Sequence, residues 1–134
     1  MSMMKDIADF HVKFGMGFGE HRARQLDPEL VKFRTEFMKE EMLEYLQACV
    51  DQDLEGQFDA LIDLTYVVLG TAYLQGFPFD EGWKRVHEAN MAKVKGPSAR
   101  SDKFDVIKPE GWTPPDLSDL IYTEQMELFD DNNS

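Results

Sequence analysis

The chain has 134 residues, which is enough for one domain with a hydrophobic core but leaves little room for a second. Its 43% hydrophobic and 30% charged residues are typical of a globular protein, no apolar run is long enough to span a membrane, and the single cysteine, Cys49, excludes an intramolecular disulfide. The net charge of -12 argues against nonspecific binding to nucleic acid. We therefore expect one cytoplasmic domain over residues 1–134 that binds neither nucleic acid nor a membrane.

The first two predicted helices are delimited by glycine and by an N-cap. A short helix over roughly residues 6–14 is ended by the glycine-rich stretch GMGFGE. The second helix opens at Asp27, a favourable N-cap, has Pro28 in its first turn, and runs to about Asp51. This helix is the longest predicted element.

Two further helices complete the predicted core. The third begins near Leu54 and ends at Gly76, a C-cap glycine that is soon followed by a proline. The fourth covers about residues 80–94 and stops before Gly96.

Beyond the fourth helix the composition changes. The sequence KFDVIKPEGWTPPDL predicts an extended, proline-rich arm, and the final EQMELFDDNNS predicts a frayed end. No segment has a convincing strand pattern or an internal repeat. The predicted fold is therefore all-α: a bundle of four main helices (core about residues 4–95) with a C-terminal arm (about 96–134).

Acidic residues gather where the second and third helices meet. The second helix contains Glu40, Glu41 and Glu44, and on the third helix Asp63 is the only charged residue between positions 60 and 79. A single carboxylate on such an apolar helix has a high desolvation cost unless something neutralises it. A divalent cation would do so, because hard cations bind carboxylate oxygens.

Helical spacing places these acids close together. Glu41 and Glu44 continue an apolar line on the second helix, and Asp59 shares a face with Asp63 on the third. Since two apolar helices joined by a short linker pack antiparallel, these four carboxylates are expected to form one pocket. The alternative is a solvated helix surface, which is the commoner outcome for acid-rich turns and the better description of Glu40 taken alone.

The donor set indicates which metal the pocket would take. None of His11, His21 and His87 follows a glutamate by three residues, as the histidines of di-iron carboxylate bundles do. Oxygen ligands alone select magnesium or manganese, ions that hold diphosphates. Residues 84–108 contain seven basic and three acidic groups, so this segment either faces a phosphate or is a solvated basic loop.

Five segments carry a resemblance to a known group of enzymes. They are ADFHVKFG (8–15), EEMLEY (40–45), DALIDLTYVVLGTAYLQG (59–76), VHEANMAKV (86–94) and IKPEGWTPPDL (107–117). In this order they resemble the all-α nucleoside triphosphate pyrophosphohydrolase superfamily, and more closely its phosphoribosyl-ATP pyrophosphohydrolase-like, MazG-related members of phages and bacteria. For a phage-encoded chain, the compartment would be the host cytoplasm.

The resemblance implies hydrolysis of a nucleoside triphosphate between its α and β phosphates, with Mg²⁺, or Mn²⁺ in its place. The residues that match the metal ligands are Glu41, Glu44 and Asp63. Glu40 matches a glutamate that orients or deprotonates the attacking water, and Asn90 and Lys93 match a pair that faces the phosphates; Lys108 is a further expected phosphate contact.

One position departs from the pattern of these relatives. Many have Glu-x-x-Asp on the second metal helix, but here the residue three before Asp63 is Ala60, and Asp59 lies four before it. Asp59 therefore lies about 1.5 Å further from Asp63 along the helix axis than the glutamate of these relatives does. It is expected to bind the metal directly, through water, or not at all.

The substrate is less well defined by the sequence. The resemblance to phage-type enzymes favours a purine deoxynucleotide such as dGTP, while phosphoribosyl-ATP and a bundle that binds metal or nucleotide without turnover are the alternatives. The aromatic residues that would either stack on a base or fill the core are Phe10, Phe14, Phe18 and Trp83. Trp112, in the arm, is expected to close over the site or to reach a partner chain.

The apolar surface predicts self-association. The stripe of the third helix that is expected to face the second consists of Phe58, Leu61, Thr65, Val68 and Ala72. The residues off this stripe, which are expected to form a subunit contact, are Tyr66, Val67, Tyr73 and Leu74. We therefore expect a homodimer or homotetramer that completes the bundle.

Overall fold

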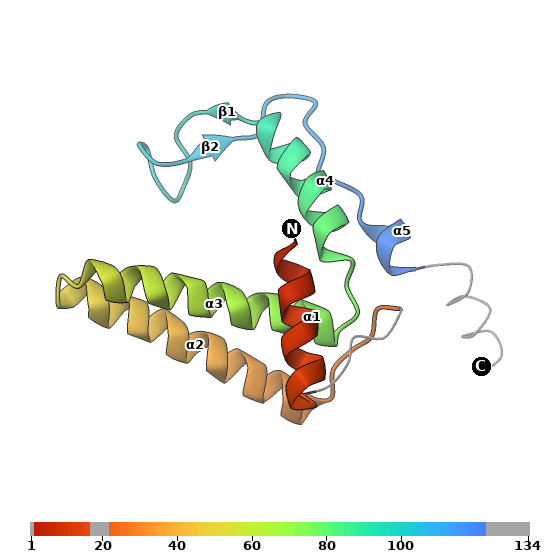
Figure 1. Cartoon of the computed structure of the whole chain (residues 1–134). Coiled ribbons are helices and arrows are strands. Elements are labelled where there is room, and N and C mark those ends of the chain that lie inside the picture. Colours follow the sequence, from red (N-terminus) through yellow and green to blue (C-terminus); the bar gives the residue numbers. More distant parts are fainter. Residues whose placement is uncertain (1, 17–21, 123–134) are drawn as a thin grey trace. The chain divides into compact units, whose positions relative to one another are not determined.

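The computed structural model describes residues 2–16 and 22–122, and the chain divides into two compact units, Met1–Phe79 and Asp80–Ser134 (Figure 1). The elements are α1 (Met3–Phe14), α2 (Pro28–Val50), α3 (Leu54–Leu74), α4 (Phe79–Met91), β1 (Val94–Lys95), β2 (Val106–Ile107) and α5 (Ser118–Ile121). The expected, mostly helical architecture with four main helices is confirmed. Among the described residues no single helix is long and apolar enough to cross a membrane. Helices α3 and α4 reach the required length and apolar composition only when they are taken as one bent pair.

The helix ends follow the expected local chemistry. The Asp27 side chain accepts a hydrogen bond of 3.1 Å from the Leu30 N–H and so caps α2. At the end of α3, Gly76 has a φ of 70° and the Phe77 N–H donates to the Ala72 carbonyl, the six-to-one bond of a Schellman motif. Helix α1 is ended by Gly15, as expected; the other glycines of GMGFGE lie outside the described residues.

Helix α1 begins earlier than the sequence indicated. Its first residue is Met3 rather than a residue near Asp6, because the Ser2 hydroxyl accepts a hydrogen bond of 3.2 Å from the Met4 N–H. Serine is a favourable N-cap, since its side chain satisfies one of the backbone donors that a helix start leaves unpaired.

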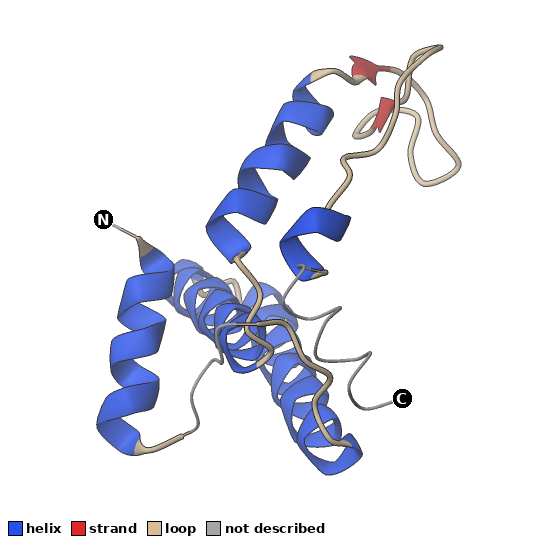
Figure 2. Ribbon diagram, turned by 90° about the vertical axis from the view of Figure 1, so that its right-hand side faces the viewer, coloured by secondary structure: helices blue, strands red, loops and turns tan. Residues whose placement is uncertain are grey.

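Helices α2 and α3 form an antiparallel hairpin, as predicted, and they lie side by side in both views (Figures 1 and 2). Asp53 caps α3 by accepting a bond of 2.9 Å from the Gly56 N–H. The two helices approach closely at this end, because a Cβ atom added at Gly56 would lie 3.3 Å from the Cβ atom of Ala48. Small residues thus set the spacing of the hairpin.

The face that α3 turns toward α2 differs from the predicted stripe. Phe58 and Leu61 of that stripe are exposed (69% and 48%), whereas Val67 and Thr71 meet the guanidinium of Arg34 on α2. Because α3 is apolar on most of its circumference, hydrophobicity alone does not select a face. The face is selected by the small residues and by the groups of α3 that accept hydrogen bonds from Arg34.

Helix α1 packs against α3 and covers much of the surface that was expected to form a subunit contact. The ring of His11 lies edge-on to Tyr73, with centroids 5.0 Å apart, and Tyr66 receives a similar contact from Phe10. Val67 and Leu74 are only 5% and 3% exposed. The prediction that these residues lie at a subunit contact is wrong for Val67 and Leu74, because their own chain buries them.

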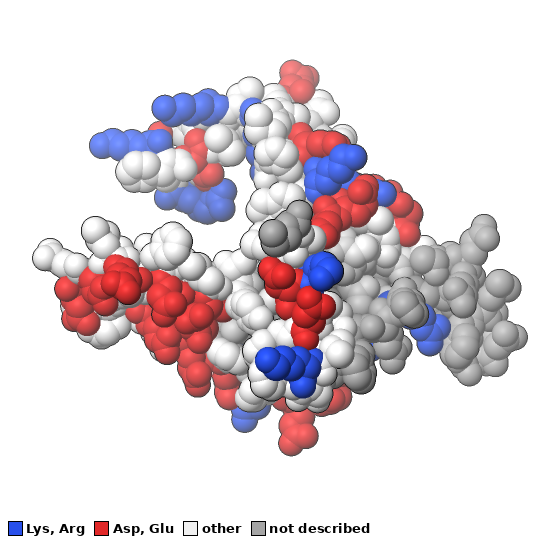
Figure 3. Space-filling view, in the orientation of Figure 1, with Lys and Arg blue, Asp and Glu red and all other residues white. Residues whose placement is uncertain are grey.

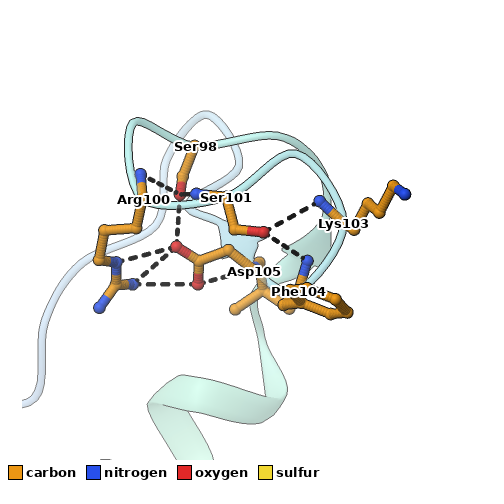
Figure 4. A network of polar contacts seen from close by, with 7 residues as sticks. Ser98, Arg100, Ser101, Lys103, Phe104 and Asp105 are labelled. Carbon is orange, nitrogen blue, oxygen red and sulfur yellow. Dashed lines mark hydrogen bonds and ion pairs between the residues drawn. The ribbon is translucent and has the colours of Figure 1, made fainter.

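The second unit contains strands that the sequence did not predict. Helix α4 ends at Met91, and the chain then forms a two-stranded antiparallel hairpin that pairs Val94 with Ile107 and Lys95 with Val106. Two-residue strands are too short to show a period in the sequence. The loop between the strands is ordered by Asp105, which accepts hydrogen bonds from Ser98 and Arg100 (Figure 4).

The arm after this hairpin folds back instead of extending. The Trp112 indole N–H donates to the Ala89 carbonyl at 2.7 Å, and the Arg85 guanidinium binds both carboxylate oxygens of Asp119 at 2.6 and 3.0 Å. These bonds attach the arm to α4 within the second unit. The predicted frayed end, EQMELFDDNNS, lies outside the described residues.

Candidate metal centre

Three carboxylates meet between α2 and α3. One oxygen from each of Glu41, Glu44 and Asp63 lies within 4.8 Å of the other two. Oxygen ligands of Mg²⁺ and Ca²⁺ bind at roughly 2.0–2.6 Å, so two oxygens on one ion are at most about 4–5 Å apart. The spacing therefore allows all three groups to hold the same cation, and acidic side chains gather over this hairpin in the space-filling view (Figure 3).

Glu41 is the most constrained of the three carboxylates. Its side chain belongs to a residue that is 9% exposed, and its Oε2 atom is buried without a hydrogen-bond partner among the described residues. Burial, followed by the neighbouring carboxyl of Glu44 and the charges of Asp63 and Glu40, raises the pKa of Glu41 to about 7. A divalent cation would supply the missing partner of Oε2 and offset the crowded negative charges.

Asp63 is in a similar but milder environment. It is half-buried, and its pKa is raised by burial and then by the charges of Asp59 and Glu44. Its position opposite Glu41 and Glu44 follows from the antiparallel register of the hairpin, in which Ala48 meets Gly56 further along. The structure thus brings together the three residues that the sequence singled out as ligands.

Glu40 and Asp59 lie at the edge of this cluster. Both are exposed, and neither belongs to the group of three oxygens found among the described residues. The charge of Glu40 acts on Glu41, and the charge of Asp59 acts on Asp63. Asp59 and Glu44 also line a shallow cavity of about 300 Å³ at the closed end of the hairpin. Glu40 and Asp59 are therefore placed to act on the cluster from the solvent side.

The three predicted phosphate contacts all belong to the second unit. Asn90 is exposed on α4, and its carbonyl accepts the N–H of Lys93 at 3.1 Å. The ammonium groups of Lys93 and Lys108 lie 5.2 and 5.1 Å from the ring centroid of Trp112. The structure therefore brings the two lysines to one aromatic ring.

The candidate aromatic and histidine residues have different surroundings. Phe10 packs against Phe14 within α1, with ring centroids 4.9 Å apart, and Trp83 is 65% exposed on α4. His11 is 3% exposed and belongs to the core between α1 and α3, whereas His87 is exposed. Phe18 and His21 lie outside the described residues.

Sequence reasoning missed Arg34, which is buried on the same face of α2 as Glu41. Its Nη2 donates to the Val67 carbonyl at 2.8 Å and its Nε to the Thr71 hydroxyl at 3.0 Å. A Cβ atom added at Gly70 would lie 2.6 Å from Arg34 Nη2, so this glycine makes room for the guanidinium. The available signal was the spacing of seven residues between Arg34 and Glu41, which is two helical turns.

The arrangement suits hard-cation chemistry on phosphates. Three carboxylate oxygens from two helices leave further coordination positions for water and phosphate oxygens. Among the described residues no lysine or arginine forms an ion pair with Glu41, Glu44 or Asp63. Within the described part of the chain, no ion pair with a basic side chain therefore offsets the negative charge of the cluster.

Comparison with known proteins agrees with this chemistry. A search of curated proteins finds no match. The family model of phosphoribosyl-ATP pyrophosphohydrolase matches residues 7–90, which is more than half of the chain and includes both helices of the carboxylate cluster. The chain therefore belongs to the phosphoribosyl-ATP pyrophosphohydrolase family and is a pyrophosphohydrolase of the all-α, MazG-like superfamily.

Proposed function

We propose that this pyrophosphohydrolase uses Mg²⁺, or Mn²⁺ in its place, held by Glu41, Glu44 and Asp63, to hydrolyse a nucleoside triphosphate between its α and β phosphates. The observation that carries the proposal is the buried, unpartnered Oε2 atom of Glu41 in a cluster of three converging carboxylates. When bound, the ion would polarise a phosphoryl oxygen and lower the pKa of a bound water.

Glu40 is proposed to act on the attacking water. Its carboxylate is exposed next to the cluster, so it can accept the proton that water loses as its oxygen bonds to phosphorus. The bond between phosphorus and the bridging oxygen breaks, and the products are a nucleoside monophosphate and pyrophosphate. Asp59, which acts on Asp63 through its charge, is proposed as an outer ligand of the metal.

Asn90, Lys93 and Lys108 are proposed to bind the phosphates. The amide N–H groups of Asn90 and the ammonium groups of the lysines are donors to phosphate oxygens, and a bond to a charged group is stronger than a neutral one. Asn90→Ala and Lys93→Ala should weaken the binding of a triphosphate more than that of a monophosphate, measured by calorimetry. Equal effects on both nucleotides would remove these residues from the phosphate site.

We propose a purine deoxynucleoside triphosphate such as dGTP as the substrate, in the cytoplasm, or in the host cytoplasm if the chain is phage-encoded. Phosphoribosyl-ATP is the second candidate, because the description of the matching family names it. Both candidates contain the bond between the α and β phosphates.

One experiment tests the reaction, the bond and the base together. The protein is incubated with Mg²⁺ and, separately, with each common NTP, each dNTP and phosphoribosyl-ATP, and the products are separated by chromatography. We expect monophosphate and pyrophosphate from a purine dNTP. Saturable Mn²⁺ binding without turnover of any substrate would instead indicate a bundle that binds metal without catalysis.

We further propose a homodimer or homotetramer. Phe58, Leu61 and Ile62 are 69%, 48% and 49% exposed, and they line an apolar cavity of about 460 Å³ beside α1. Contiguous apolar surface of this kind is typical of subunit contacts. Light scattering should give a mass of at least twice 15.5 kDa, and a fully active monomer at micromolar concentration would contradict the proposal.

A further inference from the structure

Trp112 lies close to two of the lysines of the second unit. The Nζ atoms of Lys93 and Lys108 are 5.2 and 5.1 Å from the centre of its indole ring. The two nitrogens are therefore no more than about 10 Å apart, although their residues are separated by the whole β1–β2 hairpin. No other described ring receives both cations.

The position of Trp112 is set by a local turn and by a hydrogen bond to α4. The Trp112 N–H donates to the Pro109 carbonyl at 3.0 Å, and Gly111 between them has a φ of 82°, as the third residue of a type II turn requires. The indole N–H then donates to the Ala89 carbonyl on α4 at 2.7 Å. The turn and the bond together hold the ring against α4, and Lys93 follows the end of that helix by two residues.

The ring restrains the two lysines without using up their hydrogen-bonding capacity. A free lysine side chain has large rotamer entropy, which binding of an anion must overcome. Cation–π attraction holds each ammonium over the ring, while N–H donors that point away from the ring stay available to an anion. Two restrained ammonium groups that share one ring suit an extended anion with several charged oxygens.

We propose that Trp112 is a positioning residue that holds Lys93 and Lys108 together as a site for the phosphates of the substrate. This inference rests on the proposed function, because it takes a triphosphate as the anion. It adds a residue from the part of the chain beyond the family match, which ends at residue 90.

The test compares two substitutions of the same residue. Trp112→Leu removes the ring, and we expect KM for the triphosphate to rise about three- to tenfold while kcat changes by less than about twofold. Trp112→Phe keeps an aromatic face and the turn but removes the bond to the Ala89 carbonyl, so KM should rise clearly less than in Trp112→Leu. If Trp112→Phe is as impaired as Trp112→Leu, the bond to α4 and not the ring acts on the site, and the proposal is wrong.

Phe104→Leu is the matched control. This phenylalanine lies in the same unit, is 89% exposed, and its backbone N–H keeps its bond to Ser101 whatever the side chain (Figure 4). The substitution should change neither KM nor kcat. Far-UV circular dichroism and thermal melting of all variants establish that the helices are retained, and a raised KM in the control would attribute the effect of Trp112→Leu to general loosening of the unit.

Binding of inorganic tripolyphosphate separates this inference from the proposed function. Calorimetry should show weaker binding of tripolyphosphate to Trp112→Leu than to the wild type. In a variant in which Lys93 and Lys108 are already replaced by methionine, adding Trp112→Leu should cause no further loss of affinity. If no nucleotide is hydrolysed but this difference is found, the proposed function fails and the lysine site stands. If the wild type turns over triphosphates and Trp112→Leu binds tripolyphosphate equally well, the inference fails and the function stands.

Discussion

Arg34 and Glu41 are two buried charges on the same face of α2, and the chain treats them differently. Arg34 is 5% exposed and Glu41 is 9% exposed, so both have lost most of their contact with water. The guanidinium donates to a carbonyl and to a hydroxyl of α3. The carboxylate of Glu41 faces other carboxylates, and one of its oxygens has no partner among the described residues.

The difference separates a structural charge from one that awaits a ligand. Burial lowers the pKa of Arg34, and its two hydrogen bonds compensate for the lost hydration. Burial and the neighbouring carboxylates together raise the pKa of Glu41 to about 7. A protein that keeps such a carboxylate sacrifices stability without a ligand, as is typical of functional sites.

The largest expected effect comes from removing a ligand charge. Asp63→Asn and Glu41→Gln should each reduce turnover by more than the roughly 100-fold that is typical of substitutions in the layer around metal ligands. Both variants should also melt at a higher temperature than the wild type without metal, because crowded like charges are relieved. Activity assays and thermal melting measure the two effects, and wild-type activity in Asp63→Asn would contradict the assignment.

Glu40→Gln tests whether the exposed neighbour of Glu41 has a separate role. We expect Mn²⁺ affinity to be retained and kcat to fall about 100-fold, as for loss of a group that positions or deprotonates water. Calorimetry measures the Mn²⁺ affinity, and steady-state kinetics measure kcat. A loss of Mn²⁺ affinity as large as that of Glu41→Gln would make Glu40 a ligand.

Arg34→Met should have the opposite profile to Glu41→Gln. The substitution removes two hydrogen bonds of a buried guanidinium, although the Val67 carbonyl keeps its bond from the Thr71 hydroxyl, and it should lower the free energy of unfolding by about 2–3 kcal/mol. The Mn²⁺ affinity of the folded protein should not change. Urea unfolding measures the change in stability. The exposed Lys39, substituted by Met on the same helix, is the control and should differ from the wild type by less than about 0.5 kcal/mol.

The pH dependence of the metal-free protein should report Glu41 directly. Its pKa is raised from 4.5 to about 7 on folding, so between these values the folded state binds the proton more tightly than the unfolded state. Stability should therefore fall as the pH rises from about 4.5 to 7, and it should level off above 7. Mn²⁺ competes with this proton, so its affinity should fall about tenfold per pH unit below 7. Glu41→Gln should lose most of the pH dependence of stability, and the smaller part that comes from the raised pKa of Asp63 should remain.

The smallest effect is expected at the edge of the cluster. Asp59→Asn removes a charge that raises the pKa of Asp63, but Asp59 is exposed and outside the group of three oxygens. We expect a two- to threefold change in KM or kcat at most, which is about what screened charges at a surface produce. A loss of activity equal to that of Asp63→Asn would make Asp59 a direct ligand.

Local chemistry was sufficient for much of the fold and for the acids of the site. The N-cap Asp27, the C-terminal glycine Gly76 and the antiparallel α2–α3 hairpin were all predictable, because caps and short linkers act over a few residues. The convergence of Glu41, Glu44 and Asp63 followed from helical spacing plus that hairpin.

Tertiary contacts decided what the periodicity left open. Helix α3 is apolar on most sides, so only packing could select the face with Val67 and Thr71 for Arg34. The β1–β2 hairpin and the contact of Trp112 with Lys93 join residues 11 to 19 positions apart, which no local pattern encodes. The sequence by itself thus determined which residues carry charge and on which helices, whereas the tertiary structure decided which of the buried charges found a partner, since only the packed neighbours supply one.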